Sequence, residues 1–209
     1  MSAATTSRAS FSRHEITGVV LAGGKGRRMG GVDKGLVLLN GKPMVVHVLT
    51  ALRPQVGSVI INANRNRDQY AAFGCEVIPD IVGDYFGPLA GIASAMQAVD
   101  TKYILTAPCD SPLIGDDLAA RLYDGLVRER AEISVAHDGE RMQPVFALLQ
   151  RDLLSSVVAY LEGGERKIDR WFAKHSVATV YFTDRPETFL NVNSPEDRAA
   201  LEAKLAEVH

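Results

Sequence analysis

The chain has 209 residues, and its 23 lysines and arginines nearly balance its 25 aspartates and glutamates. A chain of this length buries roughly 70% of the surface that it exposes when unfolded, which is enough for one well-packed core. The balanced charge offers no bulk attraction to nucleic acid or to an anionic membrane, so phosphate binding must be local. We therefore expect one domain over residues 16–209, with neither nucleic acid nor a membrane as a partner.

The cysteines and the N-terminal residues predict a cytoplasmic protein. Cys75 and Cys109 are too few for a secreted disulfide framework and too far apart for a CxxC redox or zinc motif. Residues 1–15 are small and polar and lack the apolar core of a signal peptide. No apolar run approaches the ~18 residues of a membrane span. We interpret residues 1–15 as a disordered tail.

Predicted strands and helices alternate along the rest of the chain. Short apolar and β-branched runs predict strands at residues 16–21, 58–62, 75–78, 102–107, 133–136, 144–149, 177–182 and 189–192. Apolar residues at helical spacing predict helices at residues 43–52, 88–99, 116–130, 152–161 and 167–175, with a last helix opened by SPED. Asp116 and Ser194 are the expected N-caps. The alternation predicts an α/β fold with a doubly wound, mostly parallel sheet flanked by helices.

The loop after the first strand is the strongest functional signal. It reads LAGGKGRRMGGVDK over residues 21–34 and combines five glycines with the cations Lys25, Arg27, Arg28 and Lys34. Glycines let backbone N–H groups approach an anion closely, and the cations can neutralise a triphosphate. The loop therefore predicts a phosphate site at the carboxyl end of the first strand, where ligands of such sheets bind.

Two named phosphate motifs compete for this loop. A Walker A loop is excluded, because no register supplies GxxxxGK followed by Ser or Thr. Gly24, Gly26 and Gly30 form GxGxxxG, a loose relative of the dinucleotide fingerprint. Because Arg65 and Arg67 follow the second strand, binding of NADP stays an alternative at this point.

Asp110 follows the fourth predicted strand, in the segment APCDSP. A carboxylate at the end of a buried strand is well placed to hold Mg²⁺ against phosphate oxygens, since Mg²⁺ commonly takes one or two carboxylates and leaves other positions to substrate and water. Dinucleotide binding requires no such metal. Asp110 could also merely begin a turn before Pro112, but together with the first loop it favours phosphoryl-type chemistry.

Asn62 and Asp80 follow the second and third strands and so are expected at the same rim. Guanine offers N1–H and N2–H donors beside the O6 acceptor, which suits a carboxylate paired with an amide, whereas adenine would not match a carboxylate. Asn191 and Asn193 in NVNSPED are further candidates at the turn into the last helix. Each of these four residues could instead be a turn former.

The remaining reactive side chains are not expected to act in catalysis. Cys109 has no histidine near it in sequence, and burial after an apolar strand is the common fate of a free cysteine. His47, His137 and His175 lack metal-ligand spacing and are interpreted as packed or surface residues.

At this point the sequence resembles a known family, the molybdenum cofactor guanylyltransferases. The shared motifs follow the family's order, from Leu21 almost to the C-terminus: LAGGKGRRMGGVDK, INANR, DYFGPLAGI, APCDSP and FLNVNSPED. The first and last are specific in combination, whereas LAGG with a basic loop is shared with sugar-phosphate nucleotidyltransferases and cytidylyltransferases. The family often has Ala or Ser where Gly26 stands, and residues 1–15 are extra.

The resemblance implies transfer of GMP from GTP to the terminal phosphate of molybdenum-molybdopterin, with release of pyrophosphate. The residues that match the family's GTP site, with Gly24 added from the same loop, are Leu21, Ala22, Gly23, Gly24, Lys34, Asn62, Asp80 and Asp110. The resemblance makes Asp110 also the Mg²⁺ ligand and places Asn191 and Asn193 near the pterin. It further implies transient contact with proteins that deliver or receive the cofactor.

Catalysis in such a reaction rests on positioning and charge neutralisation, because an ionised phosphate needs no general base. We expect Arg28 and Lys34 to stabilise the leaving pyrophosphate, Arg28 being inferred from chemistry alone. Asn193 could complete the metal shell instead of contacting the pterin. The alternatives are another phosphorylated acceptor such as a sugar phosphate, CTP with the same pterin, an NADP-dependent reductase, or a nucleotide-binding regulatory module without turnover.

Overall fold

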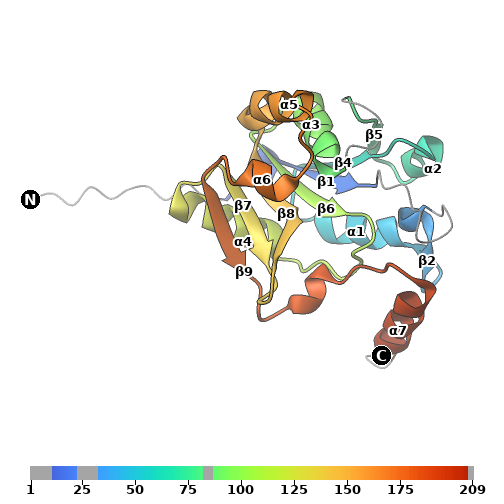
Figure 1. Cartoon of the computed structure of the whole chain (residues 1–209). Coiled ribbons are helices and arrows are strands. Elements are labelled where there is room, and N and C mark those ends of the chain that lie inside the picture. The colour runs from blue at the N-terminus through green and yellow to red at the C-terminus, as the bar shows by residue number, and fades with distance from the viewer. Residues whose placement is uncertain (1–10, 23–32, 82–86, 207–209) are drawn as a thin grey trace, which may run out of the picture.

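The computed structural model describes residues 11–22, 33–81 and 87–206, which contain a seven-stranded sheet (Figure 1). The strands in spatial order are β5 (Glu76–Ile78), β4 (Ser58–Asn62), β1 (Ile16–Leu21), β6 (Tyr103–Pro108), β8 (Met142–Gln150), β7 (Ile133–His137) and β9 (Val177–Tyr181). None of the helices in the described ranges is long and apolar enough to cross a membrane.

The sheet is mostly parallel, which confirms the predicted fold class. Strands β5, β4, β1 and β6 run parallel, β8 is antiparallel to β6 and β7, and β9 is parallel to β7. The chain proceeds outward from β1 to β4 and β5, then returns to place β6 on the other side of β1. The carboxyl ends of β1 and β6 therefore flank a topological switch point, where open α/β sheets bind their ligands.

Helices cover both faces of the sheet (Figure 1). One face is covered by α1 (Met44–Leu52) and α4 (Leu118–Glu129), and the other by α3 (Pro88–Ala98), α5 (Leu154–Glu162) and α6 (Ile168–Phe172). Successive residues of β6 alternate between the two cores, with Leu105 in the first and Ile104 in the second, both fully buried. Each such aliphatic side chain contributes about 1.5–3 kcal/mol through burial, so the sheet is a rigid platform.

Several short elements were not predicted, because one or two turns leave too little periodicity to detect. They are η1 (Arg13–Glu15), η3 (Lys34–Leu36), β2 (Leu38–Leu39), β3 (Lys42–Pro43), α2 (Arg67–Ala71) and η5 (Pro186–Phe189), whereas η4 (Arg151–Leu153) forms the start of the helix expected at residues 152–161. The first of them falls within the expected tail. There the ring of Phe11 also packs edge-on against Tyr123, with centroids 5.5 Å apart. Residues 11–15 are thus part of the folded structure.

The strand expected at residues 189–192 is absent, so this prediction was wrong. The ring of Phe189 packs against Phe146 and Phe182, with centroids 4.9 and 5.4 Å apart. The N–H of Val192 donates to the carbonyl of Asp110, 2.9 Å away. Phe189 and Val192 are buried in two different cores while Leu190 is exposed, and the segment crosses the end of β6 instead of extending the ladder.

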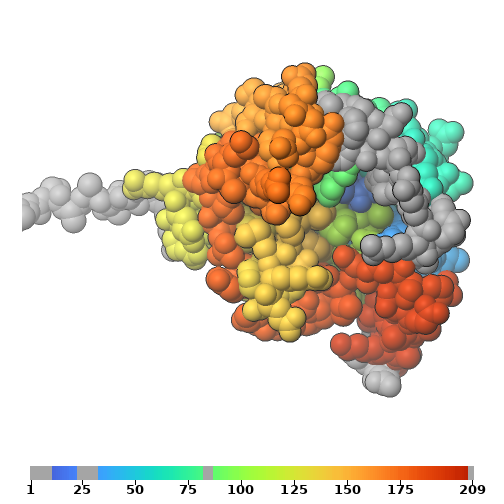
Figure 2. Space-filling view, viewed as in Figure 1, coloured from blue at the N-terminus to red at the C-terminus, as the bar shows by residue number. Residues whose placement is uncertain are grey.

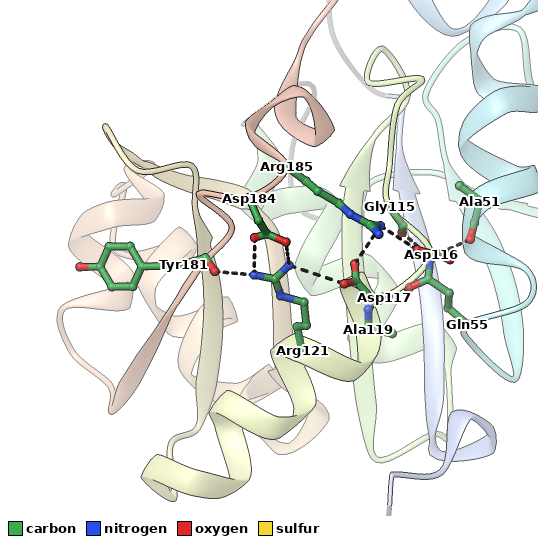
Figure 3. Close-up of polar contacts among 10 residues, drawn as sticks. All are labelled: Ala51, Gln55, Gly115, Asp116, Asp117, Ala119, Arg121, Tyr181, Asp184 and Arg185. Atoms are coloured by element: carbon green, nitrogen blue, oxygen red, sulfur yellow. Dashed lines mark hydrogen bonds and ion pairs between the residues drawn. The ribbon is translucent and has the colours of Figure 1, made fainter. Parts of the chain in front are cut away.

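The expected N-cap at Asp116 was also wrong. Helix α4 begins at Leu118, and Asp116 instead pairs with Arg185, whose Nη1 lies 2.8 Å from Asp116 Oδ1 (Figure 3). The pairing lowers the pKa of the Asp116 carboxyl. Asp117 occupies the N-cap position of α4, so Asp116 lies one residue before the position from which a side chain caps a helix.

Arg121 fastens the segment after β9 to α4 (Figure 3). Its guanidinium donates to both carboxylate oxygens of Asp184, at 3.0 and 2.9 Å, and to the carbonyl of Tyr181 at 2.6 Å. It also stacks on the ring of Phe182, 3.9 Å from the centroid. Planar, bidentate contacts of this kind fix geometry well, so the start of the C-terminal segment is held in one position.

Helix α7 (Pro195–Ala206) ends the described chain, and Ser194 caps it as predicted. Ser194 Oγ accepts the N–H of Asp197 at 3.1 Å. Leu201 and Val192 pack with Leu39 and Met44 in a small separate core. These contacts hold α7 and the segment before it against β2 and the start of α1.

Candidate active site

Lys34, Asp110 and Asn193 come together at the switch point. Lys34 is the first residue of η3, Asp110 follows β6, and Asn193 precedes α7. The Lys34 ammonium lies 2.9 Å from Asp110 Oδ2 and 2.6 Å from Asn193 Oδ1. Three residues that the sequence predicts independently thus form one cluster, with the Lys34 and Asp110 side chains 24% and 12% exposed.

Asn191 lies in the same segment and is bound to the loop after β6. Ser111 Oγ donates to Asn191 Oδ1, and Asn193 Nδ2 lies 3.4 Å from the carbonyl of Asn191. Together with the Val192–Asp110 backbone bond, these contacts lay residues 191–193 alongside residues 110–111. Asn191 is therefore close to the cluster but has its side-chain oxygen engaged by Ser111.

Asp197 holds the backbone of Asn193 in place. Its Oδ2 accepts the backbone N–H of Asn193 at 2.9 Å. This bond, followed by the hydroxyl of Ser194, lowers the pKa of Asp197 below its usual range. The Asn193 backbone is thereby fixed by a charge-assisted hydrogen bond while its side chain faces Lys34.

Asn62 and Asp80 also meet, as the sequence predicts, on the other side of β1. Asn62 Nδ2 donates to Asp80 Oδ1 at 3.0 Å. Asn64, which we did not predict, donates from Nδ2 to Asp80 Oδ2 at 2.7 Å, and its Oδ1 accepts the Asp80 N–H at 2.8 Å. The missed signal was the alternation in INAN, because residues two apart in an extended chain share a side.

Leu21 and Ala22 connect the two groups of residues. The carbonyl of Leu21 accepts the N–H of Cys109 at 3.1 Å, and the N–H of Ala22 donates to the carbonyl of Asn62 at 2.8 Å. The exit from β1 is therefore held between the strand that leads to Asp110 and the strand that ends at Asn62. Gly23, Gly24, Lys25, Arg27 and Arg28 of the predicted phosphate loop lie outside the described residues.

Gly91 explains how α3 approaches this rim so closely. A Cβ added at Gly91 would lie 2.7 Å from Leu21 Cδ2 and would also collide with Asn62 Oδ1. Real Cβ atoms do not tolerate such contacts, and the Asn62 side chain is buried and hydrogen-bonded to Asp80, so it cannot readily move away. Glycine at this position therefore lets a helix pack directly against the side chain that meets Asp80.

Asp33 is a second residue that the sequence did not single out. Its buried carboxylate accepts hydrogen bonds from Tyr70 Oη at 2.5 Å and Asn66 Nδ2 at 2.9 Å, and Arg65 Nε lies 3.7 Å away. Burial, followed by the nearby Cys109 and Asp33, raises the pKa of Tyr70, so its hydroxyl stays a donor. These contacts fix the backbone immediately before Lys34.

The cysteine and histidines behave as the sequence suggests. Burial raises the pKa of Cys109, so its thiol is neutral at physiological pH and a poor nucleophile. His47 bonds to the carbonyl of Leu39 at 3.1 Å, and His137 packs against Tyr181. His175 lies between Ser156 and Glu132. Each has a structural partner away from the candidate site.

The molecular surface is hollowed on the face toward which β1 and β6 point their carboxyl ends. Figure 2 shows this hollow, with atoms of the blue and green segments at its floor. The yellow β7–β8 hairpin and the red segment before α7 border it (Figures 1 and 2). Ligand sites of α/β sheets are concave in the same way and lie beyond the same strand ends.

The fold and the site together define a class of protein. A mostly parallel sheet flanked by helices, with a lysine, a strand-end carboxylate and amide side chains at its switch point, is the arrangement of a Rossmann-like nucleotidyltransferase. The chain belongs to the family of MobA-like NTP transferase domains, whose family model matches residues 18–179.

Two relatives share about half of their residues with this chain over almost their whole length. The molybdenum cofactor guanylyltransferase of Shewanella sediminis is 49% identical over 192 residues, which cover 92% of this chain and 98% of the relative. The protein of the same name from Shewanella sp. strain MR-4 is 50% identical over 191 residues, which cover 91% and 97%.

Solved structures share the fold at lower identity. Molybdopterin-guanine dinucleotide biosynthesis protein A from Archaeoglobus fulgidus superposes with a TM-score of 0.75 at 22% identity, covering 91% of this chain and 99% of its own. The 4-diphosphocytidyl-2C-methyl-D-erythritol synthase of Anaerococcus prevotii gives 0.73 at 12% identity, covering 93% and 100%. At these identities the likeness concerns the fold alone.

Proposed function

We propose that this protein transfers GMP from GTP to the terminal phosphate of molybdenum-molybdopterin and releases pyrophosphate. The single observation that supports it most is the convergence of Lys34, Asp110 and Asn193 at the switch point, with the Asn62–Asp80 pair across β1. Phosphate chemistry and base recognition then have separate residues on either side of one strand. The names of the half-identical relatives support the same substrates.

Asp80 is the proposed guanine-binding residue. A carboxylate accepts two parallel N–H groups, which guanine presents at N1 and N2 and adenine does not. Asn62 and Asn64 each donate to one oxygen of this carboxylate, so its orientation is set before a base arrives. We infer that the carboxylate does not have to rotate when guanine binds. Because adenine lacks the two N–H groups, only GTP benefits from this preset orientation.

On the other side of β1, the side-chain oxygens of Asp110 and Asn193 fit a magnesium ion. Asp110 supplies a carboxylate oxygen and Asn193 a carbonyl oxygen, both of them hard ligands of the kind Mg²⁺ prefers. A positive charge is already stabilised between them, because the Lys34 ammonium contacts both oxygens. When bound here, Mg²⁺ would neutralise charge on phosphate oxygens.

The reaction proposed for this site is an in-line displacement. An oxygen of the acceptor's terminal phosphate attacks the α-phosphorus of GTP, the bond from this phosphorus to the bridging oxygen breaks, and pyrophosphate leaves with the electron pair. The attacking phosphate is already ionised, so no side chain has to remove a proton. Lys34 stabilises the negative charge of the triphosphate and of pyrophosphate, and Asn191 and Asn193 border the acceptor side.

Binding and product analysis test this proposal. Binding to the intact protein would be measured by fluorescence titration with GTP, CTP, ATP and NADPH, and GTP is expected to bind tightest. Incubation with Mg²⁺, molybdenum-molybdopterin and each nucleoside triphosphate should yield the guanine dinucleotide by mass spectrometry. Tighter binding of NADPH, or a dinucleotide formed only with CTP or with a sugar phosphate as acceptor, would replace the proposal.

A further inference from the structure

We propose that the Lys34 ammonium and a divalent cation occupy the same site in turn. In the nucleotide-free protein Lys34 bridges Asp110 and Asn193, and the triphosphate draws Lys34 away so that these two oxygens become free for the metal. This inference rests on the proposed function for its physiological ligand. Its test, however, measures metal binding and needs no turnover.

The distances make simultaneous occupancy unfavourable. Lys34 Nζ lies 2.6 Å from Asn193 Oδ1 and 2.9 Å from Asp110 Oδ2, whereas Mg²⁺ would lie about 2.1 Å from each oxygen. Two cations that share both oxygens would thus be held close together in a partly buried setting, where repulsion is weakly screened. The two oxygens can bind either cation well, but binding both at once is costly.

The backbone of Lys34 is fixed, so the exchange needs only a side-chain movement. The N–H groups of Leu36 and Val37 donate to the carbonyls of Asp33 and Lys34, at 3.0 and 3.2 Å. The Asp33 carboxylate is held by Tyr70 and Asn66. A lysine has a flexible four-carbon stem, and its ammonium can move to a phosphate by changing rotamers alone.

The expected consequence is that metal and nucleotide bind cooperatively. The metal alone must break the Lys34 contacts with Asp110 and Asn193, which opposes its binding. A triphosphate provides new oxygens for the ammonium and further oxygens for the metal. Each ligand therefore raises the affinity for the other, as thermodynamic linkage requires.

The test is a titration with Mn²⁺ in the absence of nucleotide, with free Mn²⁺ measured by electron paramagnetic resonance. Lys34→Met removes the ammonium and keeps the length of the side chain. We expect it to bind Mn²⁺ at least tenfold more tightly than the unaltered protein. The non-hydrolysable analogue GMPCPP should raise the affinity of the unaltered protein at least as far.

Two controls separate a shared site from a general charge effect. The double variant Lys34→Met/Asp110→Asn should lose the gain, and Lys34→Met/Asn193→Ala should lose part of it, while thermal melting shows that each variant is folded. In 1 M KCl, where the Debye length is about 3 Å, most of the gain should persist, because competition at contact distance is less screened than through-space attraction.

The inference would be overturned if Lys34→Met bound Mn²⁺ with an affinity within threefold of that of the unaltered protein. It would also be overturned if the double variant Lys34→Met/Asp110→Asn kept the full gain in Mn²⁺ affinity. The proposed function can fail separately. A tenfold gain in Mn²⁺ affinity without any guanine dinucleotide product would remove the proposed substrates and leave the exchange standing. Formation of the guanine dinucleotide without a gain in Mn²⁺ affinity would support the proposed function and overturn the exchange.

Discussion

Asn64 and Asp80 bind each other at two points, with the Asn64 amide donating to the carboxylate at 2.7 Å and accepting the Asp80 N–H at 2.8 Å. Both ends of one amide side chain thereby fix a single residue. The carboxylate receives a second hydrogen bond from Asn62. Its plane is consequently set by the two asparagines, one on each oxygen, before any ligand binds.

We expect Asp80→Asn to reduce the preference for GTP over ATP. The change preserves size but removes the charge and one acceptor, so guanine loses a partner for N1–H or N2–H. A lost hydrogen bond to a charged group corresponds to about 1.5–3 kcal/mol, or a roughly tenfold to hundredfold fall in kcat/KM for GTP. Competing turnover of GTP, ITP and ATP would measure it. Unchanged ratios among the three nucleotides would end the assignment of Asp80 to the base.

Asn64→Ala should change the same ratio by a smaller factor. Asp80 keeps its charge and its bond to Asn62, but one carboxylate oxygen and one backbone N–H lose their partner. We expect a fall of up to about tenfold in the GTP to ATP ratio, in line with one neutral hydrogen bond. The KM for GTP should rise while the KM for the pterin stays constant. A uniform loss of kcat with both KM values unchanged would mean that Asn64 acts elsewhere.

Lys34→Ala should lower turnover and leave base preference intact. Lys34 lies across β1 from Asp80, beside Asp110, and its proposed role is to neutralise phosphate charge. Losing one such cation costs several kcal/mol of transition-state stabilisation, so a fall on the order of a hundredfold is expected. Relative kcat/KM values for GTP and ATP provide the readout. A variant that accepts ATP as readily as GTP would show that Lys34 serves the base.

The hydrogen bond between the Asn193 N–H and the Asp197 carboxylate predicts that replacing Asp197 changes the stability of the protein by an amount that depends on pH. Because hydrogen bonds from Asn193 and Ser194 lower the pKa of Asp197, its ionised form favours the folded state. This contribution is present above the unfolded pKa of about 3.9 and is lost as the pH falls through the lower folded value. Asp197→Asn should therefore melt below the unaltered protein at pH 7, with the gap narrowing below about pH 4. A gap that widens in acid would contradict the assignment.

Strand periodicity predicted the platform and the position of most candidate residues. Buried runs such as β1 and β6 need only local composition to be recognised, and polar residues that follow them must lie at one edge of a parallel sheet. Asn62, Asp80 and Asp110 were found in this way. Residues 189–192 were mistaken for a strand because a short apolar run does not say whether its side chains belong to a strand or to an irregular segment that packs on the core.

The contacts that Lys34 and Asp33 make could not be predicted. Nothing local indicates that Lys34 would bridge Asp110 and Asn193, since the bond to Asn193 spans 159 positions of the chain. The support of Asp33 by Tyr70 and Asn66 depends likewise on a short helix that leaves no periodic signal. Such pairs follow from tertiary packing, which brings together residues whose spacing in sequence is arbitrary.

The central claim, that GMP transfer occurs at the switch point around Asp110, is tested most directly by Asp110→Asn. The change is nearly isosteric, so the fold should persist, but an amide is a poorer Mg²⁺ ligand than a carboxylate. The measurement is guanine dinucleotide formation from GTP and molybdenum-molybdopterin over a Mg²⁺ titration, alongside thermal melting of both proteins. We predict equal melting and a rate lower by on the order of a hundredfold or more. A variant that melts like the unaltered protein and turns over within a few fold of it at low Mg²⁺ would contradict the account.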